Sequence, residues 1–143
     1  MKKSGRVQRL ADLSGTVEKL AAQAVSQAQA ELTRLQQQAL DLERYRDEYL
    51  RPLKEGSRPV GGYEVQKLRV FVGKIDQALK QLRGKVGQAQ AAVAQAEEVW
   101  NEQRRRTQTM NNVAERARSV EEAQAEKALQ REIDDRPRQG AAS

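Results

Sequence analysis

The side chains in this sequence that could do chemistry are carboxylates, cationic groups and a few phenols, because the chain contains no Cys and no His. Their absence excludes disulfides and thiolate nucleophiles, and it removes the commonest metal ligand and general base. The pair Gly61 and Gly62 lacks the remainder of any phosphate-binding motif. The many Asp and Glu residues are expected on solvated helix faces, where neighbouring carboxylates arise by chance. We therefore expect no enzyme activity, no bound metal and no cofactor.

The aromatic residues have the most informative spacing. Tyr45, Tyr49, Tyr63 and Phe71 lie close together in the sequence, and the only other aromatic residue is Trp100. Tyr45 and Tyr49 are four positions apart in the stretch ERYRDEYL, which places them on one face of a helix. Either these rings cover the seam of a thin helical core, or they form an exposed patch for a partner, since aromatic side chains are enriched at interface hot spots.

Long helices are the elements expected to position these residues. Charged residues make up 32% of the chain, the mean hydropathy is −0.87, and Ala, Gln, Glu, Arg and Leu dominate, a composition typical of coiled coils. One stretch, RPLKEGSRPVGGY, interrupts the helical pattern with prolines and glycines. We predict one domain spanning residues 1–143, with a helix at about 8–50, a loop at 51–62, a second helix at about 63–133 and a disordered tail at 134–143.

The second predicted helix carries the strongest pattern in the sequence. Apolar residues recur at alternating steps of three and four, which is the a and d pattern of a coiled-coil seam. A short loop between two helices makes them antiparallel neighbours. We therefore predict an all-α fold, a long antiparallel two-helix coiled-coil hairpin whose second helix overhangs the first. The seam residues are Val65, Leu68, Val72, Ile75, Leu79, Leu82, Val86, Ala89, Val93, Ala96 and Trp100.

The first predicted helix has a looser apolar stripe, and a bend near residue 57 sets the register expected between the two helices. That bend places Tyr49 level with Val65, and Leu13 level with Asn101. The N-terminal end of the first helix then lies level with about residue 105 of the second helix. The part of the second helix after residue 105 is therefore expected to have no partner within the chain. The stripe of the first helix comprises Leu13, Val17, Leu20, Ala24, Ala28, Leu32, Leu35, Ala39, Leu42, Tyr49 and Leu53.

The chain is basic, with a net charge of +6 and a pI of about 9.8. One alternative is therefore a basic coiled coil that binds nucleic acid, and another is a homo-oligomeric scaffold, since a/d seams also mediate self-association. Acidic residues interleave with the basic ones, and no aromatic residue stands among the arginines to stack on bases, which disfavours nucleic acid. No apolar run approaches the ~20 residues that span a bilayer, and we expect a cytoplasmic protein. The arginines of the nucleic-acid alternative are Arg104, Arg105, Arg106, Arg116 and Arg118.

Three stretches together resemble the flagellar FliJ family: ERYRDEYL, the Pro/Gly loop, and YEVQKLRVFVGKIDQALKQLRGKV followed by a long helix rich in Ala, Gln and Arg. The resemblance covers roughly residues 8–135. It implies a small non-enzymatic protein of the bacterial flagellar type III export apparatus, similar in fold to the central stalk subunit of rotary ATP synthases. It also implies three kinds of partner: the hexameric export ATPase, whose ring assembly the protein promotes, the export-gate membrane protein, and export chaperones. Association with the cell membrane at the flagellar base would be peripheral, through these partners.

The resemblance implies two binding sites. A patch near the bend is expected to contact the export gate, through two sets that each run i, i+4, i+7, i+11 along one helix face. The open end of the hairpin is expected to enter the ATPase ring, where apolar side chains pack in the channel and arginines meet acidic groups; a solvated helical tail without contacts is the alternative. The gate-contact residues are Gln38, Leu42, Tyr45, Tyr49, Phe71, Ile75, Ala78 and Leu82. The ring-contact residues are Arg105, Met110, Val113, Arg116, Arg118 and Val120.

Overall fold

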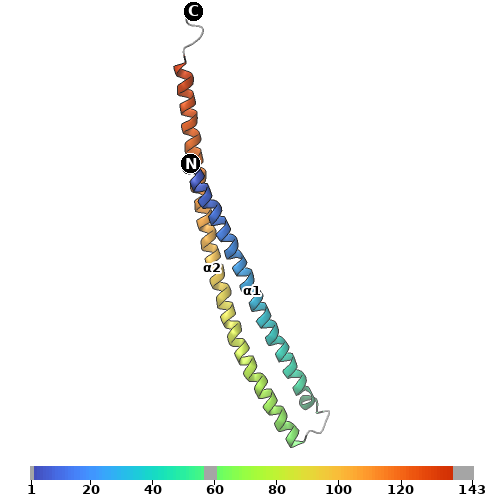
Figure 1. Ribbon diagram of the computed structural model, residues 1–143. Coiled ribbons are helices and arrows are strands. Elements are labelled where there is room, and N and C mark those ends of the chain that lie inside the picture. The colour runs from blue at the N-terminus through green and yellow to red at the C-terminus, as the bar shows by residue number, and fades with distance from the viewer. Residues whose placement is uncertain (1, 57–60, 137–143) are drawn as a thin grey trace, which may run out of the picture. The chain divides into compact units, whose positions relative to one another are not determined.

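Two long helices account for nearly all of the structure, a computed structural model that describes residues 2–56 and 61–136. α1 (Lys3–Glu55) and α2 (Gly62–Asp135) pack against each other as a hairpin (Figure 1). α2 is the longer helix, with 74 residues against 53. The predicted all-α hairpin with a longer second helix is confirmed. Residues 57–60 of the predicted loop and residues 137–143 of the predicted tail lie outside the described residues.

α1 continues past the point where the loop was predicted to begin. Pro52 lies inside its last turns, although proline removes a backbone donor and crowds the preceding turn. The carbonyl that lacks its donor belongs to Glu48, four residues earlier, and the helix tolerates Pro52 because Glu48 is exposed, so water can reach this carbonyl. After α1 ends at Glu55, Gly56 has a φ of 61°, the left-handed conformation that follows many helices and that glycine adopts without strain. The predicted loop is therefore too long on its N-terminal side.

α1 also begins earlier than predicted, at Lys3 rather than near residue 8. The first turn of a helix has backbone N–H groups without helical partners, and the first turn of α1 contains no acidic residue to accept from them. Glu121 of α2 takes this role, because its carboxylate accepts a hydrogen bond from the Ser4 backbone N–H at 3.1 Å and another from the Ser4 hydroxyl. The hydroxyl and the N–H of Ser4 both stabilise the charged carboxylate, and together they lower the pKa of Glu121.

The contacts between the helices divide the chain into two compact units. The central unit comprises Ala21–Val99, and the terminal unit comprises Met1–Leu20 together with Trp100–Ser143. Each unit contains one segment of α1 packed on one segment of α2.

The central unit is held together by the predicted apolar seam of α2. Every seam residue between positions 65 and 96 is buried or half-buried, in agreement with the a and d assignment. Leu79 and Ile75 are only 2% and 5% exposed, and the buried residues of α1 in this unit are Val25 and Leu35. Full burial of such a side chain contributes about 1.5–3 kcal/mol. The central unit therefore has a thin core of branched aliphatic side chains.

The seam continues through the terminal unit with small and polar residues. Ala11 and Ala114 are buried, and the Ser14 hydroxyl lies 2.9 Å from that of Thr107. The predicted register is therefore wrong, and the segment after residue 105 has a partner in the first turns of α1. The reason is that α1 extends to Glu55, which moves the turn later in the chain and pairs every residue of α1 further along α2. Only from residue 122 onwards are all described residues of α2 exposed.

The apolar stripe predicted for the first helix is wrong in part. The heptad phase set by Val25 and Leu35 runs from Ser4 to Arg46, so large aliphatic residues at other phases, such as Leu13 and Leu20, cannot rotate into the seam. Tyr49 and Leu53 keep this phase but are exposed, so the closely packed part of the seam ends before them. The residues of the predicted stripe that are exposed are Leu13, Val17, Leu20, Ala24, Tyr49 and Leu53. The buried and half-buried seam residues of α1 are Ser4, Val7, Ala11, Ser14, Glu18, Ala21, Val25, Ala28, Leu32, Leu35, Ala39, Leu42 and Arg46.

Candidate functional site

Three aromatic rings meet in the central unit, two from α1 and one from α2. The ring centroids of Tyr45 and Tyr49 are 5.0 Å apart, and that of Phe71 lies 4.5 Å from Tyr49 and 6.0 Å from Tyr45. These separations are favourable for aromatic packing. The Tyr45 hydroxyl donates a hydrogen bond to the Tyr49 hydroxyl at 3.5 Å. The pKa of Tyr45 is raised, mainly by this hydrogen bond and secondly by the partial loss of hydration. We call these three residues the aromatic cluster.

The aromatic cluster is open to solvent. Tyr45 and Tyr49 are 44% and 41% exposed, although each contacts another ring. A groove of about 450 Å³ lies beside the cluster, and its lining includes Tyr49, Val70, Lys67 and Lys74. One carboxylate, Glu64, also lines the groove and offsets part of the charge of the two ammonium groups. The apolar walls therefore fit a protein segment with apolar side chains.

The other predicted gate-contact residues all lie in the central unit, but they differ in access to solvent. Gln38 is exposed, whereas Leu42, Ala78 and Leu82 are half-buried and Ile75 is buried. A buried side chain cannot touch a partner, so Ile75 can serve the site only by holding the two helices together. The exposed part of the predicted set is therefore Tyr45, Tyr49 and Gln38, and Phe71 is half-buried against the two tyrosine rings.

Two ion pairs connect α1 and α2 in the central unit. Arg46 Nε lies 2.8 Å from Asp76 Oδ1, although the two groups are not aligned as a hydrogen bond. Arg83 Nη2 donates to Glu43 Oε1 at 3.1 Å. The four side chains keep 37–65% of their surface exposed, although Arg46 Nε itself is buried. Ion pairs in such partly exposed positions contribute only about 0–1 kcal/mol. These pairs therefore add little to the stability supplied by the apolar seam.

The groove beside the aromatic cluster was not predicted from the sequence. Its residues Lys67, Val70 and Lys74 lie off the a and d positions, so the heptad pattern does not select them. A usable signal was present: with Tyr63 they stand at steps of four, three and four, which places them on one face of α2. Tyr63 is largely exposed, and the Lys67 ammonium lies 4.9 Å from the centroid of its ring, within the range of a cation–π contact.

The predicted ring-contact residues all lie in the terminal unit, on different sides of α2. Val113, Arg116 and Val120 line one groove of about 420 Å³, and all three are exposed. Met110 is half-buried in the seam. Arg105 donates to a backbone carbonyl of its own helix, and Arg118 pairs with a glutamate three residues before it. The structure thus brings three of the six residues together.

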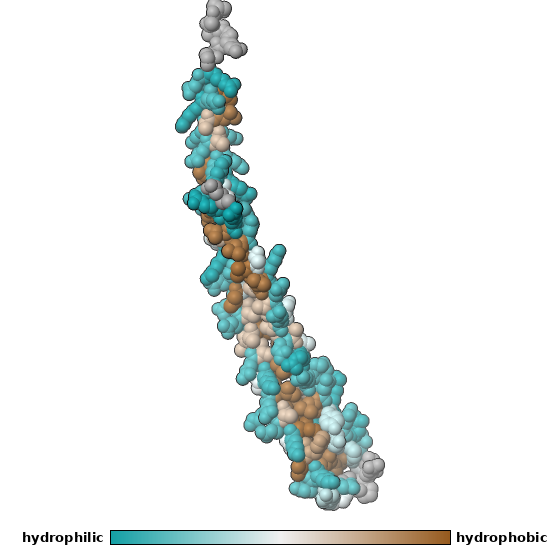
Figure 2. Space-filling view, in the orientation of Figure 1, coloured by the Kyte–Doolittle hydropathy of each residue, from teal (hydrophilic) through white to brown (hydrophobic). Residues whose placement is uncertain are grey.

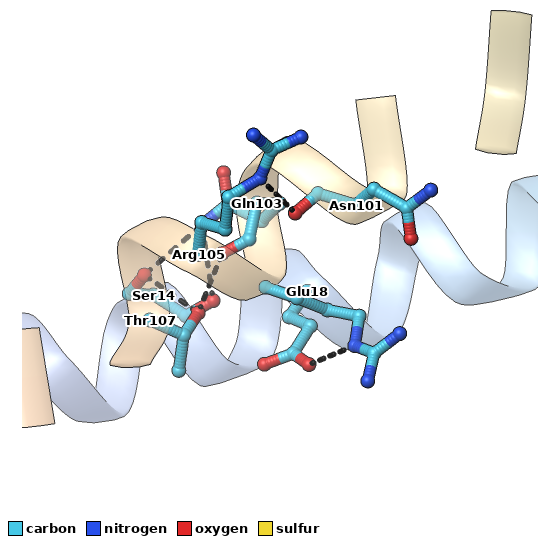
Figure 3. A network of polar contacts seen from close by, with 7 residues as sticks. Ser14, Glu18, Asn101, Gln103, Arg105 and Thr107 are labelled. Atoms are coloured by element: carbon cyan, nitrogen blue, oxygen red, sulfur yellow. Dashed lines mark hydrogen bonds and ion pairs between the residues drawn. The ribbon is translucent and has the colours of Figure 1, made fainter. Parts of the chain in front are cut away.

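A layer of hydrogen-bonded polar side chains lies inside the seam of the terminal unit (Figure 3). Gln103 Nε2 donates to the Ser14 hydroxyl at 3.0 Å and to the Ser14 carbonyl at 3.3 Å. Thr107 is only 8% exposed, and its hydroxyl has partners in Ser14 Oγ at 2.9 Å and the Gln103 carbonyl at 3.0 Å. A buried hydroxyl without partners would be unfavourable. We call Ser14, Gln103 and Thr107 the polar layer; polar groups in a seam fix the register of a coiled coil at some cost in stability.

The arginines of the nucleic-acid alternative are largely engaged with other side chains. Arg104 lies over the Trp100 ring, 4.9 Å from its centroid, and 3.9 Å from the Glu18 carboxylate. Arg106 donates to Glu102 at 2.9 Å. These neighbours reduce the positive charge offered to a phosphate backbone, and we do not propose a nucleic-acid partner.

Within residues 2–56 and 61–136, no three or more His, Cys, Asp or Glu side chains gather as the ligands of a metal ion would. In the same ranges, neither helix has an apolar stretch long enough to cross a membrane.

The comparisons with known proteins give one positive result. The family described as "Flagellar FliJ protein" matches residues 2–142, which is nearly the whole chain. No curated protein and no solved structure matches the chain. The family match confirms the resemblance found in ERYRDEYL and in the segments that follow it. The chain therefore belongs to the flagellar FliJ protein family and is a non-enzymatic component of the bacterial flagellar export apparatus.

Proposed function

We propose that this protein links the hexameric export ATPase to the export gate, with the aromatic cluster as the gate-binding surface. The observation that carries the proposal is the exposure of Tyr45 and Tyr49 in a cluster that already has internal ring contacts. Aromatic side chains that stay accessible on a thin two-helix scaffold are suited to insertion into a partner. The partner's own side chains would then complete the packing that the hairpin leaves unfinished.

Binding to the cytoplasmic domain of the export gate tests this assignment. Tyr45→Ala and Phe71→Ala should each weaken that binding by about 1–2 kcal/mol, as truncation of an interface anchor does. Leu40→Ala is the matched control, because Leu40 is an exposed aliphatic residue of the same unit outside the predicted set. If the two aromatic variants bind like the control, or if they lose helicity in proportion to binding, the cluster belongs to the core and is not a binding surface.

We further propose that the terminal unit binds the ATPase ring through Val113, Arg116 and Val120. These residues share one groove, which joins exposed apolar surface with a cationic side chain. The aliphatic contacts would resist added salt, whereas the arginine contact to an acidic group would be screened. In this arrangement the protein is peripheral on the cytoplasmic face of the membrane at the flagellar base, held there by its partners, and it promotes ring assembly and the handling of chaperones.

The ring contact is tested by stimulation of the export ATPase. Val113→Asp with Val120→Asp should abolish most stimulation while leaving gate binding intact, since both side chains are exposed and lie in the other unit. Asn112→Asp with Ser119→Asp introduces the same two charges at adjacent exposed positions and serves as the control. Truncation after Asn101 is less suitable, because it would also remove the partner of the first turns of α1. Full stimulation by the double variant would show that this groove is not the ring-binding element.

A further inference from the structure

A row of large aliphatic side chains on α1 faces away from its partner helix. Leu10, Leu13, Val17 and Leu20 are 53%, 60%, 42% and 58% exposed, and all belong to the terminal unit. The side chains that meet α2 in the same stretch are smaller or polar, and the buried one is Ala11. The largest apolar residues of α1 in this region therefore do not pack against α2. We call these four residues the aliphatic stripe.

The spacing of the aliphatic stripe is that of a second coiled-coil seam. Its steps are three, four and three, which align the four side chains along one face of α1. Isolated exposed leucines are common on protein surfaces, but a continuous row at a and d spacing is the surface onto which another helix packs. The geometry of the row fits a helix better than an extended strand, whose side chains repeat every second residue.

The charged residues around the aliphatic stripe indicate which charge a partner should carry. The same three-and-four spacing continues in the N-terminal direction to Arg6 and Lys3, and Arg9 stands next to Leu10. Acidic groups of this unit on the seam side are already engaged, since Glu121 accepts from Ser4 and Glu18 lies by Arg104. Asp12, which accepts from Gln8, is the one carboxylate among residues 2–13, against four cationic side chains in that segment, so the stripe has a cationic end. Acidic side chains on a partner would supply the complementary charge.

The cationic segment that precedes the stripe borders apolar surface of α2. Lys3 lines the same groove as Val113 and Val120, which are exposed aliphatic residues of the second helix. Figure 2 shows hydrophobic side chains, coloured brown, gathered where α1 begins alongside α2. A partner lying along the stripe would therefore find apolar surface beyond its end.

We propose that Leu10, Leu13, Val17 and Leu20 form a docking site for one amphipathic helix of a partner protein, with acidic residues at the end that meets Arg6 and Arg9. This site adds a surface on α1 to the ring contact proposed on α2 and does not depend on it. A second copy of this chain is a poorer occupant, because its stripe is flanked by the same cations and offers no complementary charge.

A synthetic peptide helix provides the probe, about three heptads long, with Leu at a and d and Glu at the flanking positions. Fluorescence anisotropy of the labelled peptide should report binding to the full-length protein. Leu13→Asp should weaken the binding at least about tenfold, as for an anchor residue. Leu40→Asp, on the exposed face of the central unit, should leave it unchanged. Arg6→Glu with Arg9→Glu should also weaken it, and a peptide with Lys in place of Glu should bind at least about tenfold more weakly.

Three outcomes would overturn the proposal. The first is equal binding by the Leu13→Asp and Leu40→Asp proteins, or equal binding of a scrambled peptide of the same composition. The second is a loss of helicity in Leu13→Asp, measured by circular dichroism, which would place Leu13 in the core of the free protein. The third is a concentration-dependent dimer in sedimentation that Leu13→Asp dissolves, which would make a second copy the occupant. An unchanged monomer with selective loss of acidic-peptide binding is the result expected.

Discussion

The two units of this protein use the same heptad spacing with opposite kinds of residue. The central unit buries Leu79 and Ile75, and Arg46 is the charged residue that enters its seam, half-buried. The terminal unit buries alanines and Thr107, and it leaves leucines such as Leu10 and Leu13 in solvent. The comparison shows that the heptad spacing determines which residues of α1 and α2 are in contact. The types of those residues determine how much the contacts stabilise the fold.

The difference also separates two tasks. Burial of branched aliphatic side chains supplies most of the stability of a helix pair, and the central unit has such a core beneath the aromatic cluster. Each hydrogen bond of the polar layer adds about 0.5–1.5 kcal/mol. These bonds are directional and fix which turns of α1 and α2 face each other. The terminal unit is thus weaker in itself and richer in exposed apolar surface, which suits a part that gains further contacts from partners.

The largest effect should come from a charge placed in the central core. Leu79→Asp buries an unpaired carboxylate in a side-chain position that is 2% exposed, at a cost of several kcal/mol before relaxation. Helicity by circular dichroism and the melting temperature should both fall sharply. Leu40→Asp in the same unit is the control, because Leu40 is 47% exposed and should tolerate the charge. Equal melting temperatures for the two variants would contradict the seam assignment.

A smaller effect is expected from the polar layer. Ser14→Ala removes the hydroxyl that contacts both Gln103 and Thr107, and the loss should be about 1 kcal/mol. Hydrogen exchange should show faster opening of the terminal unit with little change around Leu79. Thr109→Ala is the control, since the Thr109 hydroxyl bonds only within its own helix at an exposed site. Acceleration spread evenly over both units would mean that the polar layer does not act locally.

The start of α1 should respond to pH through Glu121. The folded state lowers the pKa of this carboxyl below its ordinary value, because the Ser4 hydroxyl and N–H bind the charged form. The contribution is therefore present above that value and is lost as the pH falls through the lowered pKa. Because intrinsic amide exchange itself slows on acidification, the measured rate must be divided by the intrinsic rate; the resulting protection of the first-turn amides of α1 should decrease as the pH falls in the natural protein. In Glu121→Gln this acid dependence should disappear, and its persistence would assign the effect to another group.

The smallest effect should come from the exposed ion pairs. Arg83→Ala breaks the contact with Glu43 between two well-exposed side chains, and such pairs contribute about 0–1 kcal/mol. The melting temperature should shift less than in Ser14→Ala, and the shift should shrink further in high salt. A larger loss than that of Ser14→Ala would show that the central unit depends on charge as well as on its apolar seam.

The sequence was sufficient to predict the central unit and misleading for the terminal one. The α2 seam through Ile75 and Leu79 is apolar at every a and d position, so spacing and hydrophobicity agree. In the first helix they conflict, because Leu13 is more hydrophobic than Ser14 but Ser14 has the phase of Val25 and Leu35. Extending that phase backwards, in steps of three and four, would have found the correct seam.

The ends of α1 were harder to predict. Its start depends on a hydrogen bond to Glu121, which is far away in the sequence. The residues around Ser4 contain no pattern that predicts this contact. Its end lies beyond Pro52, a residue that usually terminates a helix. In the candidate site, the spacing of Tyr45 and Tyr49 indicated a shared face, whereas the groove beside them depends on Lys67 and Lys74, which carry no hydrophobic signal.

The pairing of the first turns of α1 with α2 is tested most directly by a cysteine cross-link. The chain contains no cysteine, so Ser14→Cys with Thr107→Cys introduces the only two thiols, at positions whose hydroxyls are 2.9 Å apart. Mild oxidation should form an intramolecular disulfide rapidly, detected by mass and by altered migration without reductant. Leu13→Cys with Asn101→Cys, the pair made level by a bend near residue 57, should remain reduced under the same conditions. Rapid closure of the second pair with no closure of the first would contradict the polar seam and restore an unpartnered second helix beyond residue 105.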